Sequence, residues 1–151
     1  MDFDTASDTA SDTAGESRPM IDSLTVQTSR RVEFIDITDR VRAVVARTGV
    51  QSGECIVYVP HTTAGVTLNE NADPTVREDL IAHLARLAPV DGVYRHAEGN
   101  SDAHLKAGLL GFSVLVLVEG GCLVLGTWQG IYLAEFDGPR SRRVLVKVRP
   151  D

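Results

Sequence analysis

Apolar and polar residues alternate along several short segments of the chain, and this spacing predicts β-strands. The predicted strands cover residues 24–28, 32–37, 55–59, 66–68, 113–118, 122–125, 128–136 and 143–148. Gly120-Gly121 lies between two of these segments, which is typical of a β-hairpin. Asp137-Gly138-Pro139 predicts a turn between the last two strands.

Three other segments place apolar residues three or four positions apart, which predicts helices. The first runs from Thr38, a predicted N-cap, to Gly49, and the second begins at Asp73-Pro74, where the carboxylate can cap free N–H groups. The third begins at Asn100 or Ser101. The apolar stripes of the first two helices consist of Val41, Val44 and Val45, and of Val76, Leu80, Leu84 and Leu87. The order of elements predicts an α+β fold with an antiparallel, β-sandwich-like core and a few helices.

The first 18 residues differ from the rest, because they repeat Asp-Thr-Ala-Ser and contain almost nothing to bury. We expect residues 1–18 to form a disordered, low-complexity tail and residues 19–151 to form a single domain. The formal net charge of the chain is −6. Five acidic residues and one arginine give the tail −5 + 1 = −4, which leaves −2 for the domain. Without a basic stripe, nucleic acid is not expected as a partner.

Several features bear on where the protein works. Cys55 and Cys122 lie in apolar β-like runs, which predicts core thiols, and Trp128 is predicted to be a core residue as well. No segment is long and apolar enough to span a membrane, and the N-terminus lacks the basic and apolar regions of a signal peptide. We therefore expect a cytoplasmic protein with no membrane partner.

Polar residues that could bind a ligand or take part in catalysis lie in three segments. The first holds His61, Thr62 and Thr63, followed by Glu70. The second runs over residues 94–104 and the third over residues 126–130. The second contains His96, Asn100 and His104, and the third contains Gln129. The three segments lie at or near the ends of predicted elements, where side chains project from a rigid scaffold.

Three of the four histidines lie in these segments, which favours a shared site. His61, His96 and His104 could ligate a divalent metal such as zinc, or magnesium could serve a phosphorylated substrate. The same imidazoles could instead act as acid or base near neutral pH. Glu70 could act as a base or could anchor a loop. The helix start at Ser101 could hold a phosphate, or Ser101 could simply cap its helix.

The three segments together resemble the YjbQ-like family. The first motif is His61-Thr62-Thr63-Ala64 leading into Asn69-Glu70-Asn71-Ala72-Asp73-Pro74. The second is Tyr94-Arg95-His96 with Glu98-Gly99-Asn100 and Ala103-His104-Leu105-Lys106. The third is Gly126-Thr127-Trp128-Gln129 with Ile131. The resemblance extends from about residue 22 to the C-terminus and departs at Phe112, where proline is expected in the family.

The resemblance implies a homotrimer with a pocket near the subunit contacts. It also implies a secondary thiamine-phosphate synthase activity, a transferase reaction that joins a pyrimidine diphosphate to a thiazole phosphate. The native substrate could differ from these, because basic residues near the motifs are few. In this interpretation His61, Glu70, His96 and His104 are catalytic, while Thr62, Thr63, Asn100 and Gln129 bind a small phosphorylated or heterocyclic ligand. The alternative is a non-catalytic trimeric module that binds a ligand or metal in the same pocket.

Overall fold

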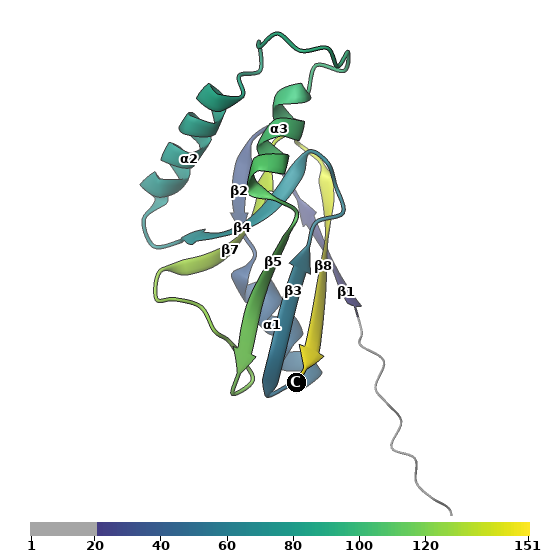
Figure 1. Cartoon of the computed structure of the whole chain (residues 1–151). Coiled ribbons are helices and arrows are strands. Elements are labelled where there is room, and N and C mark those ends of the chain that lie inside the picture. The colour runs from purple at the N-terminus through teal and green to yellow at the C-terminus, as the bar shows by residue number, and fades with distance from the viewer. Residues whose placement is uncertain (1–20) are drawn as a thin grey trace, which may run out of the picture.

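Two antiparallel sheets form the centre of the protein in a computed structural model that describes residues 21–151. The five-stranded sheet has the order β1-β8-β3-β5-β6, and the three-stranded sheet has the order β2-β7-β4 (Figure 1). The strands of the first sheet are β1 (Ile21–Gln27), β8 (Ser141–Pro150), β3 (Ser52–Tyr58), β5 (Ser113–Glu119) and β6 (Cys122–Leu123). Those of the second are β2 (Glu33–Asp36), β7 (Gln129–Glu135) and β4 (Ala64–Glu70). The predicted tail, residues 1–18, lies outside the described residues.

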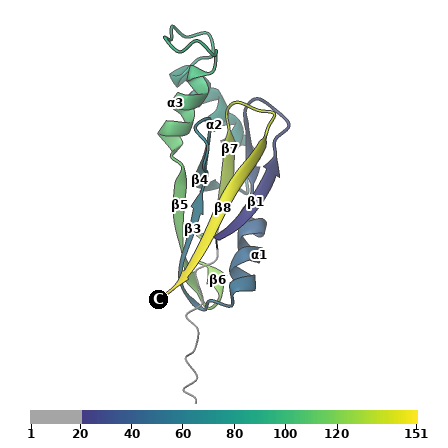
Figure 2. The ribbon, with the colours of Figure 1, turned by 90° about the vertical axis from the view of Figure 1, so that its right-hand side faces the viewer.

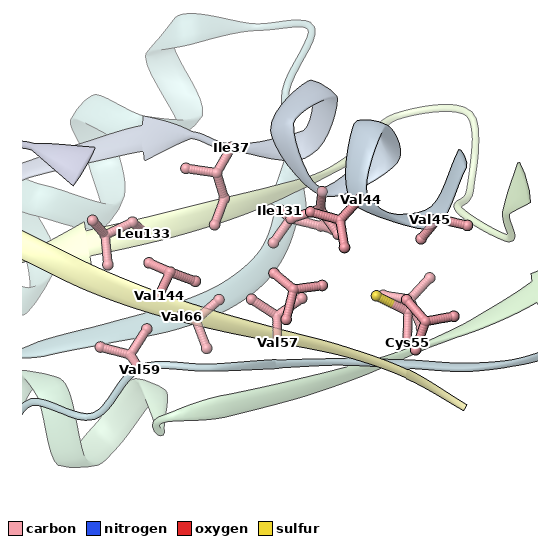
Figure 3. Close-up of a cluster of buried hydrophobic side chains, with 14 of the residues drawn as sticks. Ile37, Val44, Val45, Cys55, Val57, Val59, Val66, Ile131, Leu133 and Val144 are labelled. Atoms are coloured by element: carbon pink, nitrogen blue, oxygen red, sulfur yellow. The ribbon is translucent and has the colours of Figure 1, made fainter. Parts of the chain in front are cut away.

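The three-stranded sheet is the middle layer of the fold. Along β7, Ile131 and Leu133 point into one apolar cluster, whereas Tyr132 and Ala134 point into another, because successive side chains of a strand face opposite sides. The first cluster fills the space between the two sheets and α1 (Thr38–Thr48), as Figure 3 shows. Burial on both faces explains why the predicted 128–136 segment reads as nearly continuous apolar sequence.

The second cluster lies between the middle sheet and two helices, α2 (Pro74–Leu87) and α3 (Ser101–Leu110). The turned view in Figure 2 shows α3 and α1 on opposite sides of the sheets. The layers are therefore a five-stranded sheet, a three-stranded sheet and a pair of helices. This arrangement confirms the predicted α+β fold with an antiparallel core.

The helix ends agree with the sequence patterns in part. Asp73 caps α2 by accepting a hydrogen bond from the backbone N–H of Thr75 at 2.9 Å, as predicted. The predicted N-cap role of Thr38 was wrong. Thr38 is the first helical residue of α1, and Asp36 accepts from its backbone N–H at 2.9 Å. Ser101 likewise makes no cap hydrogen bond at the start of α3, where Asn100 holds the cap position.

Three residues predicted to be buried are exposed, because each lies at or just beyond the end of an element. Cys122 is the first residue of β6, which covers only Cys122–Leu123 of the predicted 122–125 strand, and it is exposed, while Cys55 is buried. Trp128 lies just before β7 and is 63% exposed. Leu87, at the end of the α2 stripe, is 73% exposed. Within residues 21–151 no helix is long and apolar enough to cross a membrane.

Candidate functional site

A polar pocket of about 380 Å³ lies where three connections meet at one end of the sheets. The connections are the β3–β4 turn, the segment that leads into α3, and the β7–β8 turn. The lining residues are Pro60, His61, Thr62, Thr63, Glu98, Asn100, His104, Asp137, Arg140 and Arg142. Five of the predicted site residues, namely His61, Thr62, Thr63, Asn100 and His104, therefore share one pocket although they are far apart in sequence.

A buried ion pair lies beside this pocket, which Arg142 lines. Glu135 is 0% and Arg142 4% exposed, and their side chains make two hydrogen bonds of 2.6 and 2.8 Å. Arg142 also donates to the hydroxyl of Thr63 at 2.8 Å, and Thr28 donates to Glu135 at 2.9 Å. Burial alone raises the pKa of Glu135, but the hydrogen bond from Arg142 offsets this and the net pKa lies below its ordinary value. Glu135 is therefore ionised.

His61 is fixed by the backbone of β8. The N–H of Arg143 donates to Nε2 of His61 at 2.9 Å, and a nitrogen that accepts carries no proton. The neutral ring consequently bears its proton on Nδ1. Burial lowers the pKa of His61, and the positive charge of Arg142 lowers it further. Both effects favour the neutral ring near pH 7, in which Nε2 accepts the hydrogen bond from Arg143.

Asn100 stands between the start of α3 and the β7–β8 turn. Its Nδ2 donates to Asp137 at 3.0 Å, and Asp137 also pairs with Arg140 at 2.9 Å. Burial raises the pKa of Asp137, yet the hydrogen bonds from Asn100 and Arg140 bring the net pKa below its ordinary value. An ionised carboxylate only accepts, which fixes the orientation of the Asn100 amide. Its Oδ1 is the single buried side-chain polar atom without a partner among residues 21–151.

His104 lies between this pocket and a neighbouring one. The rings of His96 and His104 are 5.3 Å apart in an edge-to-face arrangement, and both line a second pocket with Tyr94 and Leu105. His96 does not line the polar pocket that contains His61. Across residues 21–151, no three His, Cys, Asp or Glu side chains are grouped so as to hold a metal ion. The predicted three-histidine metal site therefore does not fit within one chain.

A buried acidic residue of α3, Asp102, anchors this helix. Asp102 is 0% exposed and binds both Arg31, at 2.9 Å, and Lys106, at 2.9 Å. Burial raises the pKa of Asp102, but hydrogen bonds from these two cations bring it to about 2. The anchor ties α3 to the segment between β1 and β2. It therefore holds Asn100 and His104 in place against the pocket.

Two predicted site residues, Glu70 and Gln129, lie elsewhere. They pair with each other at the far end of β4 and β7, whereas Thr63 precedes the first residue of β4. A strand rises about 3.3 Å per residue, so the seven residues of β4 separate the two groups by about 20 Å. Glu70 accepts a 2.9 Å hydrogen bond from the N–H of Asp73, which matches the loop-anchor alternative. Their predicted convergence with His61 does not occur within one chain.

A third hollow forms around these separated residues. Glu70 lines it together with Ala72, Asp73, Pro74 and Trp128, and its volume is about 470 Å³. Gln129 accepts from the N–H of Gly126 at 2.9 Å and so holds the turn before β7. The motif residues of one chain thus form two groups at opposite ends of the middle sheet.

Sequence reasoning missed the buried ion pair beside the pocket. Glu135 is the buried last residue of β7, and Arg142 occupies an inward position of β8, on the same face as Val144 and Val146. A charged residue within an otherwise apolar run, or at an inward position of an alternating strand, is the signal that would have found them. Asp137, predicted only as part of a turn, belongs to the pocket as well.

The family model for UPF0047 protein YjbQ-like matches residues 22–151. The chain belongs to the UPF0047 (YjbQ-like) family. A UPF0047 protein of Methanocaldococcus jannaschii is 46% identical over 132 residues, which is 87% of this chain and 96% of that protein. YugU, a UPF0047 protein of Bacillus subtilis, is 48% identical over 85% of this chain and 98% of its own length.

Solved structures of the YjbQ-like family share the fold. A conserved family protein of Clostridium acetobutylicum is 51% identical, covers 84% of this chain and 98% of its own, and superposes with a TM-score of 0.83. A YbjQ-like protein of unknown function from Sulfolobus solfataricus is 35% identical, covers 89% of this chain and 99% of its own, and gives a TM-score of 0.85. These names establish the family and the fold and state no reaction.

Proposed function

We propose that this YjbQ-like chain is a cytoplasmic, homotrimeric enzyme that acts on a small heterocyclic or phosphorylated molecule in the polar pocket. The observation that carries the proposal is the convergence of His61, Thr62, Asn100 and His104 beside the buried Glu135–Arg142 pair. A buried ion pair beside an open pocket is costly to maintain, and such pairs are often kept where they fix the geometry of a site.

His61 and His104 have different proposed roles, because their ring nitrogens differ in their hydrogen bonds. His61 presents an Nδ1–H donor that can stabilise negative charge as it develops on a substrate. His104 is the candidate acid or base, because it lines the same pocket and makes no side-chain hydrogen bond within the described chain. Thr62 and Asn100 supply further polar contacts to the ligand.

The homotrimer is supported by two features of the single chain. Glu70 and Gln129 lie about 20 Å from His61 along β4, so they could complete its pocket only from a neighbouring copy. A head-to-tail contact of this kind generates a closed ring when the rotation closes. In addition, Leu115 and Leu117 on the outer face of β5 are 51% and 55% exposed, an apolar surface that a second copy would cover.

The reaction suggested by the resemblance is the secondary thiamine-phosphate synthase condensation. Both guanidinium groups at the pocket already pair with carboxylates, Arg140 with Asp137 and Arg142 with Glu135. They leave little positive charge for a diphosphate, which favours a native substrate with less negative charge. A divalent metal would need ligands from two chains, and metal analysis of untagged protein tests that part of the proposal.

The test is an assay of the wild-type trimer with the pyrimidine diphosphate and thiazole phosphate, following thiamine phosphate and pyrophosphate with and without a chelator. His104→Gln should lower turnover at least about a hundredfold, in the range of a lost acid–base group. His83→Gln, outside all motif segments, is the matched control. Binding of the substrates without turnover would assign the chain to the non-catalytic binding module instead.

Complementation tests the shared site. His61→Gln and Gln129→Ala homotrimers should each be inactive. Trimers reassembled from a mixture of the two should regain activity, because some pockets then receive both wild-type residues. Absence of recovery in verified mixed trimers, or a monomer by light scattering at micromolar concentration, would contradict a site shared between copies.

A further inference from the structure

The exposed ring of Trp128 stands on a turn whose backbone is held in place. Trp128 is 63% exposed, although burying an aromatic ring of this size normally stabilises a protein. Its carbonyl accepts a hydrogen bond from the N–H of Asn71 at 2.9 Å, and the N–H of Gln129 donates to the carbonyl of Gly126 at 3.0 Å. Gln129 also accepts from the N–H of Gly126 at 2.9 Å. The ring is therefore presented to solvent from a fixed backbone, a placement that suits contact with a ligand.

A hollow of about 470 Å³ lies against this ring, and its other lining residues are Glu70, Ala72, Asp73 and Pro74. Within residues 21–151, the carboxylate of Glu70 accepts hydrogen bonds only from the backbone N–H of Asp73, at 2.9 and 3.2 Å, and forms no ion pair. This single neutral donor leaves most of the acceptor capacity of a carboxylate free. The hollow thus combines an aromatic surface with a carboxylate that has no cationic partner in the described chain.

The second acid of the hollow, Asp73, is likewise bonded only by neutral groups among the described residues. Its carboxylate accepts from the hydroxyl and the N–H of Thr75 at 2.7 and 2.9 Å, and these two hydrogen bonds lower the pKa of Asp73. Asp73 caps α2, whose N-terminus carries about +0.5 elementary charge. The two carboxylates contribute −1 − 1 = −2, so the lining stays negative when that half charge is included.

Two further charged side chains lie outside the lining but close to it. The guanidinium carbon of Arg77 lies 5.7 Å from the centre of the Tyr132 ring. Burial raises the pKa of Tyr132, and the charge of Arg77 opposes this. The charges of Asp36 and Glu70 raise the same pKa, so all three charged side chains lie near this ring. Arg77 and Asp36 have opposite charges and offset each other, which leaves the excess of negative charge in the hollow.

We propose that the hollow beside Trp128 binds an alkylammonium group, whose positive charge lies over the indole and faces the carboxylate of Glu70. Among aromatic side chains, tryptophan attracts a cation most strongly. Ala72 and Pro74 supply apolar contacts for the alkyl substituents. The inference goes beyond the proposed function, because it assigns a ligand to Trp128 and requires neither the synthase reaction nor the polar pocket.

The experiment compares two probes that differ only in charge. Choline and 3,3-dimethylbutan-1-ol have the same shape, but a carbon atom replaces the charged nitrogen in the second. Each is titrated into the wild-type protein and followed by the indole N–H signal in NMR spectra, which reports on Trp128 alone because the chain has one tryptophan. We expect choline to bind at least about fivefold more tightly, the order of one cation–π contact. Added salt should weaken this preference.

Two variants assign the preference to the hollow. Glu70→Gln should reduce it, because the amide keeps an acceptor for the N–H of Asp73 and removes the charge. Trp128→Leu should reduce it as well, followed through the backbone amides of residues 70–74. Glu119→Gln, which removes an exposed carboxylate at the end of β5 outside the hollow, is the matched control and should leave the preference unchanged. If Trp128→Leu does not fold, the wild type and Glu70→Gln still decide.

Three results would overturn the proposal. The first is equal binding of the two probes, which would make the hollow an apolar site without selectivity for charge. The second is an indole signal that shifts with neither probe, as when a neighbouring copy covers the ring. The third is a preference that survives both variants. A negative synthase assay with a clear choline preference would refute the proposed reaction alone, and an active synthase without that preference would refute this inference alone.

Discussion

Replacing Arg142 by methionine removes the cation that pairs with Glu135 in the interior. The guanidinium makes three side-chain hydrogen bonds, two to Glu135 at 2.6 and 2.8 Å and one to Thr63 at 2.8 Å. In the variant, Glu135 retains the Thr28 hydroxyl and the backbone N–H groups of Phe136 and Asp137. These groups are neutral and cannot balance a charge that is 0% exposed.

The expected loss is large. Breaking a buried ion pair by removing one partner costs about 3–5 kcal/mol, because the remaining charge stays desolvated. A domain typically has about 5–15 kcal/mol of stability, so Arg142→Met should come near the limit of folding. Adding Glu135→Gln should recover most of the loss, because the amide removes the charge and still accepts from the two backbone N–H groups.

The assay is urea unfolding at one fixed protein concentration, since assembly would make stability depend on concentration. Arg149→Met is the matched control, because Arg149 lies on the same strand and pairs with Glu54 while being 62% exposed. Exposed pairs contribute about 0–1 kcal/mol. If Arg142→Met lost no more than Arg149→Met, or if Glu135→Gln failed to rescue it, the buried pair would not have the role inferred for it.

Three further expectations follow from the packing and the pKa directions. Leu84→Ala should cost about 2–5 kcal/mol in urea unfolding, whereas Leu87→Ala, at a residue that is 73% exposed, should cost under about 0.5 kcal/mol. Burial raises the pKa of Asp102, but hydrogen bonds from its paired cations bring it to about 2. The contribution of Asp102 to the free energy of unfolding is therefore complete above about pH 4 and is lost toward pH 2. Asp102→Asn should accordingly weaken the fall of stability at acidic pH. Burial and then the charge of Arg142 lower the pKa of His61, so Arg142→Met should raise that pKa in an NMR titration, and an unchanged value would contradict the assigned cause.

The fold was predictable because its apolar pattern is local. Alternation along β3 and β8 and the stripe of α1 each identify a buried face without knowledge of its partner. The pattern does not say which apolar runs end up under a second layer. Trp128 and Cys122 show this, because Trp128 lies in the turn before β7 and Cys122 is the first residue of the short strand β6, and both are exposed.

The candidate site could be predicted only in part, because the sequence does not show which connections between elements lie side by side in the fold. His61, Asn100 and His104 meet because the β3–β4 turn and the start of α3 lie at one end of the middle sheet, a feature of topology rather than of spacing. The family resemblance implies that Glu70 and Gln129 share a pocket with them, and the length of β4 separates them. The resemblance names these residues without showing where they lie relative to one another.

The separation of the motif residues carries the strongest inference about how the protein works. Glu70 and Gln129 sit beside the exposed ring of Trp128 at one end of the sheet, while His61 and Asn100 sit beside a buried ion pair at the other. A single chain thus holds two partial sites about 20 Å apart, each rich in polar groups. In the head-to-tail ring proposed above, the two ends would meet at every interface, and one sequence would supply both halves of each pocket.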